Sequence, residues 1–275
     1  EIADDGVDND GNGYVDDIYG WSFLSGPGGE IGPETMEFVR DMNRLSTKEA
    51  LSGPEKKQLK KYRKRLKKDR KSAEKSIGFM RTLNDAYTEI EAHCGGSLSV
   101  DCANSYKEGE DVGFMKKLVA GGVVRMLEEG MEQWQIKDEI TGGFTHFNDQ
   151  LEYHLNPDFN PRGMVGDDPE SNENPYYGDN RVYGPDASHG THVAGIIGAK
   201  RSNGIGMDGV ANNARIMTLR VVPNGDERDK DVANAIRYAV DNGAKVVNMS
   251  FGKDVGHMDA YVESAIQYAG DHDVL

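Results

Sequence analysis

The longest regular hydrophobic pattern of the chain lies between residues 54 and 95, where apolar side chains recur every three, four or seven positions. This spacing places them on one face of an α-helix. The face consists of Leu59, Tyr62, Leu66, Ala73, Ile77, Met80, Leu83, Tyr87 and Ile90. Pro54 suits the first turn, and Gly95 with Gly96 ends the pattern. The pattern predicts one helix of roughly ten turns.

A second helical period follows at residues 111–129. Its apolar positions are Phe114, Leu118, Val119, Val123, Met126 and Leu127. The two helices belong to a stretch whose composition differs from the rest of the chain. We therefore expect a helical insertion at residues 30–150.

Beyond the insertion, segments with strand and helix patterns alternate. Strands are predicted at residues 214–222 and 245–250, and helices at 232–241 and 259–268. Asp229 or Asp231 is placed to cap the start of the first of these helices. Alternation of this kind implies right-handed crossovers and a mostly parallel sheet with helices on both faces. The predicted fold class is therefore α/β, with an α-helical insertion.

The remaining hydrophobic signal near the start is a short strand at residues 20–23, which the Gly-Pro-Gly-Gly run 26–29 ends. Together with the pattern after the insertion, it divides the chain into three parts. Residues 1–29 and 151–275 form one α/β domain, and the helical insertion of residues 30–150 separates them.

The amino-acid composition argues against some classes of binding partner. The 275 residues include 32 basic and 47 acidic side chains, a net charge of −15, which argues against general nucleic-acid binding. No apolar run approaches the roughly 20 residues of a membrane span. Charge is uneven, because residues 48–75 carry 13 basic and 4 acidic residues. This helix presents either a solvated face or a surface for an acidic partner or lipid headgroups, and the partner of the insertion is not assigned.

Cys94 and Cys102 are the two cysteines. In an exported protein they close a small disulfide loop, whereas in the cytosol they remain thiols. The spacing alone leaves both states open.

Near the start of the chain, oxygen-bearing side chains alternate as in the first half of an EF-hand calcium loop. Asp8, Asp10 and Asn12 occupy the first three ligand positions, and Asp16 a later one. The twelfth position is Tyr19 instead of glutamate, so the full pattern is not met. We expect structural Ca²⁺ in a shortened loop; the alternative is a solvated acidic turn.

The chemistry of the chain centres on residues 186–199, where polar residues precede small and branched apolar ones. We expect a short helix buried in the core, with Ser188 as its N-cap. His189 then projects from the first turn, a placement that suits a general base. The alternatives are a packed core histidine, or a zinc site with His192 for which no third ligand is evident.

The run His-Gly-Thr-His-Val-Ala-Gly at residues 189–195 resembles the histidine motif of the subtilisin-like serine peptidases. Residues 246–252 resemble the substrate strand of that family, which implies that Met249, Ser250, Phe251 and Gly252 line the specificity pocket. Residues 201–211 resemble a family calcium loop, which implies Asn203 as a side-chain ligand.

This resemblance implies a serine endopeptidase acting on polypeptides through a Ser-His-Asp triad, with His189 as its histidine. No Gly-Thr-Ser occurs in the chain, so we expect a fragment whose serine follows Leu275 and whose aspartate precedes Glu1. The fragment alone is then inactive, and its parent is secreted or attached to the cell envelope. The alternative is a non-catalytic binding module on a degenerate peptidase scaffold, acting through the helical insertion.

Overall fold

A computed structural model describes residue 2 and residues 4–275 of the chain, which divide into two units. The first unit contains the residues up to Thr47 together with Pro157–Leu275, and the second contains Lys48–Asn156. Each unit has its own hydrophobic core.

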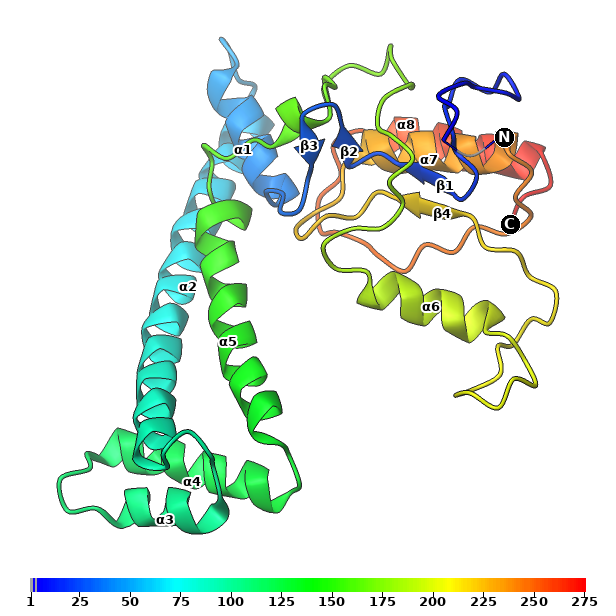
Figure 1. Cartoon of the computed structure of the whole chain (residues 1–275). Coiled ribbons are helices and arrows are strands. Elements are labelled where there is room, and N and C mark those ends of the chain that lie inside the picture. Colours follow the sequence, from blue (N-terminus) through cyan, green and yellow to red (C-terminus); the bar gives the residue numbers. More distant parts are fainter. Residues whose placement is uncertain (1, 3) are drawn as a thin grey trace. The chain divides into compact units, whose positions relative to one another are not determined.

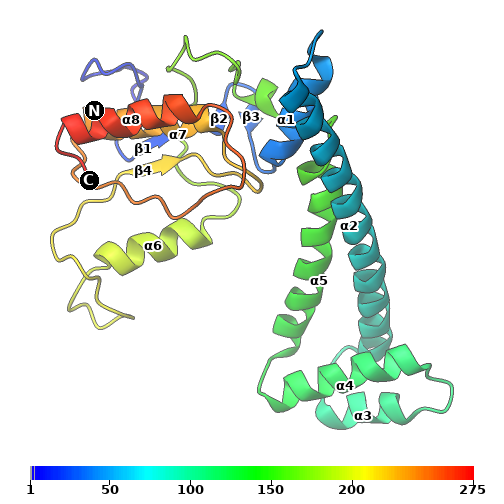
Figure 2. The same ribbon diagram turned by 180° about the vertical axis from the view of Figure 1, so that it is seen from behind.

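The second unit is helical. Its elements are α2 (Gly53–His93), α3 (Val100–Glu108), α4 (Phe114–Glu128), α5 (Gln133–Asp149) and a π-helical turn, η1 (Gln150–His154). Both views show α2 and α5 running side by side, with α3 and α4 across one end (Figures 1 and 2). The two predicted helices are confirmed as α2 and α4. Ser52 and Glu55 start α2 with reciprocal side-chain-to-backbone hydrogen bonds.

The core of this unit lies where α3 and α4 meet the ends of α2 and α5. Its buried members are Ala86, Tyr87, Ile90, Ala103, Tyr106, Val119, Ala120, Val123, Val124, Ile136 and Ile140. Tyr87 and Ile90 belong to the apolar face recognised in the sequence, so the helical period there marks a buried seam.

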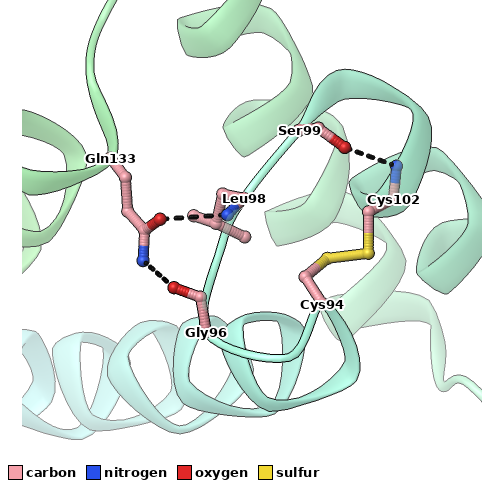
Figure 3. The surroundings of a disulfide bond; sticks show 6 residues. All are labelled: Cys94, Gly96, Leu98, Ser99, Cys102 and Gln133. Atoms are coloured by element: carbon pink, nitrogen blue, oxygen red, sulfur yellow. Dashed lines mark hydrogen bonds between the residues drawn. A yellow bond between two sulfur atoms is a disulfide. The ribbon is translucent and has the colours of Figure 1, made fainter.

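Cys94 and Cys102 form a disulfide that joins the end of α2 to the first turn of α3. Figure 3 shows the loop that it closes. The Gln133 side chain holds this loop, since its Oε1 accepts from the Leu98 N–H at 2.9 Å and its Nε2 donates to the Gly96 carbonyl at 3.1 Å. Of the two states that the spacing left open, the structure has the disulfide.

Replacing both cysteines, as Cys94→Ser with Cys102→Ser, is expected to destabilise the helical unit by about 2–3 kcal/mol, because a short cross-linked loop restricts the unfolded chain. Urea unfolding followed by far-ultraviolet circular dichroism measures this loss, since most of the helical residues that the structure describes lie in this unit. A reducing agent serves as the control and is expected to destabilise the parent but not the variant. Equal unfolding midpoints for parent and variant would contradict the prediction.

In the first unit, β1 (Gly20–Ser22) pairs in parallel with β4 (Thr218–Arg220), and β2 (Ser25–Gly26) pairs antiparallel with β3 (Gly29–Glu30). Gly20 permits the first pairing, since it has a φ of +117° and a Cβ there would lie 2.0 Å from the Thr218 carbonyl oxygen. A small parallel sheet is thus present, compatible with the predicted α/β class.

The helices of this unit are α1 (Glu37–Thr47), α6 (Ser188–Gly198), α7 (Asp229–Asp241) and α8 (Asp259–Asp271). In both views α7 and α8 lie together on one side of β1 and β4, while α6 lies on the other (Figures 1 and 2). The core fills the space between the strands and α7. It includes Tyr14, Trp21, Phe23, Leu24, Ile31, Val165, Tyr177, Val221, Val232, Ile236 and Tyr238.

The predicted strands are longer than those observed. Only Thr218–Arg220 of residues 214–222 forms a strand, and residues 245–250 form none. That second segment is paired only at its start, where the Leu275 N–H donates to the Lys245 carbonyl and the Val247 N–H donates to the Leu275 carbonyl. A strand needs a neighbour along its length, and one residue supplies too few ladder bonds.

Helix α1 belongs to the first unit, so the observed boundary falls at Thr47, later than the residue 30 taken from the sequence. The cause is a buried contact of Arg40, which donates to the carbonyls of Asp226 and Glu227, both at 3.1 Å. Arg40 also pairs with Glu37. Burial alone would raise the pKa of Glu37, but the charge of Arg40 holds it below its usual value.

Candidate functional site

His189 is the second residue of α6, and its side chain is exposed. A turn formed by Asp186 precedes it: the carboxylate accepts from the Ser188 N–H at 3.0 Å and from the Ser188 hydroxyl at 2.7 Å. These two bonds lower the pKa of Asp186, and the nearby His189 adds a smaller effect in the same direction. The imidazole therefore stands at the mouth of a helix beside a carboxylate, open to a reactant.

The expected N-cap is wrong by one residue. Ala187 occupies the cap position, and Ser188 begins the helix. The Ser188 hydroxyl donates to Asp186, so it does not cap the backbone of the first turn.

The expectation that this helix is buried is also wrong, because none of its residues is buried. One loop holds its C-terminal end, where the Gly209, Val210 and Ala211 N–H groups donate to carbonyls of α6 and of the residue after it. Ile196 is 55% exposed. The apolar side chains of residues 193–199 are thus exposed or partly exposed in this chain.

The residues predicted to line a substrate pocket are accessible as well. Met249 is 45% and Phe251 37% exposed, while Ser250 and Gly252 are exposed. The Ser250 hydroxyl accepts from the Asn248 side chain at 2.9 Å. In the described part of the chain, no hydrogen bond or ion pair joins His189 to residues 249–252, so the structure does not bring these two predicted parts into direct contact.

In the acidic loop, the predicted calcium ligands hold the backbone of the loop itself. The Asp8 carboxylate accepts the N–H groups of Gly11, Asn12 and Gly13 at 2.7–3.1 Å, and the bond from Gly13 is the main cause of its lowered pKa. Asp10 accepts from the Asn12 N–H at 3.1 Å. The loop is therefore ordered by its own hydrogen bonds.

The other predicted calcium ligands also accept hydrogen bonds from backbone N–H groups. The Asp16 carboxylate accepts from the Asp5 N–H at 3.0 Å and the Gly6 N–H at 3.1 Å. The Asn203 Oδ1 accepts from the Ile205 N–H at 2.9 Å. Among the described residues, no three His, Cys, Asp or Glu side chains come together as a metal site.

Two hydrogen bonds that the sequence did not predict fasten the acidic loop to α7 and to the residue that follows it. Asp17 is buried and accepts from the Tyr238 hydroxyl at 2.5 Å. The Asn12 amide also donates to the side chain of Asn242 at 2.9 Å. Burial and the hydrogen bond to Asp17 both raise the pKa of Tyr238.

The loop at residues 201–211 contains a second contact that the sequence did not reveal. Asp208 accepts from the Ser202 N–H at 3.2 Å, and the Arg201 guanidinium donates to the Gly209 and Val210 carbonyls at 2.8 and 2.7 Å. Asp208 therefore closes the loop.

Comparison with known proteins gives a match to the model of the subtilase family over residues 84–275. The chain is 46% identical over 83 residues to the thermophilic serine proteinase of Bacillus sp. (strain AK1), covering 30% of this chain and 20% of the relative. It is 46% identical over 68 residues to the cell wall-associated protease of Bacillus subtilis, covering 24% and 8%. With thermitase of Thermoactinomyces vulgaris it shares 44% over 82 residues, covering 30% and 29%.

The matched stretches thus span less than a third of each of these relatives. No solved structure matched the chain. Among the described residues, no helix has the length and apolar character to cross a membrane.

Proposed function

Because this chain belongs to the subtilase family, we propose that the protein is a serine endopeptidase in which His189 is the general base. In this role the imidazole takes the proton from a serine hydroxyl as that oxygen attacks the peptide carbonyl. The resulting imidazolium then protonates the leaving amine. The observation that carries the proposal is the exposed ring of His189 at the start of α6, within the run that resembles the family's histidine motif.

The exposed segment Met249–Gly252 supports a polypeptide as the substrate. In the described part of the chain its backbone N–H and C=O groups make no hydrogen bonds, and two of its side chains are apolar. An extended substrate pairs with such a free edge as an added strand, and side-chain pockets then select the residue to be cleaved. We propose that Met249, Ser250, Phe251 and Gly252 form this edge.

Labelling the full-length protein with a fluorophosphonate tests the proposal, because the probe reacts with an activated serine. We expect one labelled serine, loss of labelling in His189→Ala, and full labelling in Ser250→Ala. Absence of label in the folded full-length protein would reject the peptidase function and favour the binding module.

The 275-residue chain on its own is expected not to hydrolyse casein, since it contains no Gly-Thr-Ser and its serines lack an elbow that would present them to His189. Release of acid-soluble peptides measures this, with the full-length protein as the positive control. Steady hydrolysis by the purified chain, at a rate that His189→Ala abolishes, would contradict the expectation.

We also propose that the acidic loop binds Ca²⁺ through Asp8, Asp10, Asn12 and Asp16, and the loop at residues 201–211 through Asn203. Carboxylate and amide oxygens are the ligands that Ca²⁺ prefers. In the structure the oxygens of Asp8, Asp10 and Asn12 accept backbone N–H groups of the same turn, so the ion would bind a preformed loop.

Saturating Ca²⁺ is expected to stabilise the first unit by about 2–3 kcal/mol when it exceeds the Kd about a hundredfold. Thermal melts with Ca²⁺ and with a chelator measure the shift. Asp8→Asn with Asp10→Asn is expected to remove most of it, and Asp273→Asn, which is exposed and lies outside both loops, serves as the control. Identical melts with and without the chelator would contradict both sites.

An exported location is consistent with this function. One relative is named a cell wall-associated protease, and a disulfide such as Cys94–Cys102 persists in oxidising compartments. We therefore propose that the protein is secreted or attached to the cell envelope.

A further inference from the structure

The first half of α2 carries an unusual concentration of positive charge. Between Lys56 and Lys71 there are 11 basic residues and one acidic residue, Asp69. Eight of these basic residues are lysines, and together we name them the lysine face. Its members are Lys56, Lys57, Lys60, Lys61, Lys64, Lys67, Lys68 and Lys71.

The lysine face is one continuous surface. At about 100° per residue, the eight lysines fall within a sector about 140° wide that is about 22 Å long. Every one of them is exposed, whereas Leu59 and Tyr62 of the same turns are buried on the opposite side. No acidic residue of α2 falls within this sector between its first and last lysine.

The charges of the lysine face are not compensated within the chain. In the described structure none of the eight side-chain ammonium groups makes a hydrogen bond or an ion pair, in contrast to the guanidinium groups of their arginine neighbours. Arg65 pairs with Asp69 at 3.4 Å, and Arg70 donates to the Leu155 carbonyl at 2.8 Å.

Several of the lysines are also placed where they repel one another. Five pairs lie four residues apart: Lys56–Lys60, Lys57–Lys61, Lys60–Lys64, Lys64–Lys68 and Lys67–Lys71. Like charges at this spacing destabilise a helix, and an anionic partner removes that cost. The lysine face therefore destabilises the unbound helix, and an anionic partner would offset that destabilisation.

We propose that the lysine face binds an extended, acidic segment of another polypeptide. Lysines one turn apart on a helix are about 6 Å apart along its axis, close to the roughly 6.6 Å between alternate residues of an extended chain. In a segment with acidic residues at alternate positions, the carboxylates are therefore spaced like the lysines that lie one turn apart on α2. This inference does not depend on the peptidase activity.

A linear partner fits better than a membrane surface. The face between Lys56 and Lys71 contains no apolar side chain to insert among lipids, and the whole chain has a net charge of −15, which opposes approach to an anionic plane. A narrow acidic segment meets the local positive field without that opposition.

Fluorescence anisotropy of the 275-residue chain with a labelled oligoglutamate of about ten residues tests the proposal, since that length spans the face. We expect binding that weakens as salt rises. The triple variant Lys60→Glu, Lys64→Glu and Lys68→Glu is expected to weaken it at least about tenfold. The matched control carries the same charge change on exposed lysines elsewhere, as Lys107→Glu, Lys200→Glu and Lys245→Glu, and is expected to retain binding.

Circular dichroism checks that both triple variants keep the helix content of the parent. Polyphosphate and vesicles of phosphatidylserine with phosphatidylcholine are tested in parallel. The proposal is overturned if oligoglutamate does not bind, if the two triple variants lose binding equally, or if only polyphosphate or the vesicles bind.

Discussion

His189→Ala in the full-length protein is expected to lower kcat/KM for peptide hydrolysis at least about 10⁴-fold while leaving the fold intact. In subtilisin, which belongs to the same family, removal of the catalytic histidine lowers kcat about 10⁶-fold. The bound of about 10⁴-fold is lower because a more reactive substrate depends less on proton transfer. A loss of this size separates a general base from a residue that only shapes the site, because a packing role does not abolish proton transfer.

Because His189 is exposed, the His189→Ala substitution should not disturb the packing of the protein. The ring is open to solvent and α6 has no buried side chain, so truncation creates no cavity and removes no core contact. Thermal stability is therefore expected to stay close to that of the parent. A large fall in rate without a fall in stability isolates the chemical role.

His192 provides the matched control, since it lies on the same helix and is also exposed. His192→Ala is expected to cost less than about tenfold in kcat/KM. If it instead abolished activity while His189→Ala preserved it, the base would be the other histidine of the motif. If neither mattered, the family's proton-transfer role would not apply to this chain.

Local patterns in the sequence predicted helices better than strands. The helical period of residues 54–95 depends on contacts within one turn and its neighbours, and α2 forms where that period predicted it. A strand depends on a partner that the local pattern does not specify, and among the described residues only Leu275 pairs with the backbone of residues 245–250. The apolar content of α6 likewise predicted burial, whereas burial depends on which other segments cover the helix.

The site could be predicted only as far as its motifs are contiguous in sequence. His189 and the acidic loop were recognisable because their residues are neighbours along the chain. The bond from Tyr238 to Asp17 joins residues 221 positions apart, and no spacing rule points to it. Such pairings are set by how α7 packs on the loop, which only the folded chain reveals.

The contacts of Asp231 are a second case that spacing in the sequence does not predict. Asp229 or Asp231 was expected to cap α7, but Arg228 occupies the cap position and both aspartates lie within the helix. The Asp231 side chain is fully buried. Its carboxylate accepts two hydrogen bonds from the Arg162 guanidinium, at 2.9 and 3.0 Å, and one from the Tyr177 hydroxyl at 2.6 Å. Arg162 is 2% exposed and also pairs with Asp167.

This buried cluster fastens the segment that leads to His189 onto α7. Arg162, Asp167 and Tyr177 all precede α6 in a stretch with little regular structure, so side-chain bonds replace the missing backbone ladder. Burial raises the pKa of the Tyr177 hydroxyl, and the charge of Asp231 raises it further, which keeps this hydroxyl a donor. The position of the segment then depends on a set of charges that has no access to water.

Arg162→Met is accordingly expected to destabilise the first unit by about 3–5 kcal/mol, because it leaves the Asp231 carboxylate buried with Tyr177 as its one remaining side-chain donor. Urea unfolding measures the loss through the fluorescence of the buried Trp21. A Trp134→Phe background makes Trp21 the sole reporter, since the chain contains two tryptophans.

The double variant Arg162→Met with Asp231→Leu separates the cost of an unpaired charge from the value of the ion pair. It is expected to recover part of the lost stability, since both buried charges are removed together. Arg237→Met on the same helix is the control: its guanidinium lies at the surface, donates to Ser264 and is expected to cost less than about 1 kcal/mol. The comparison is made in a Tyr177→Phe background, because Asp231→Leu would otherwise leave the buried Tyr177 hydroxyl without its acceptor. If the single and double variants were equally unstable there, shape rather than charge would hold this segment.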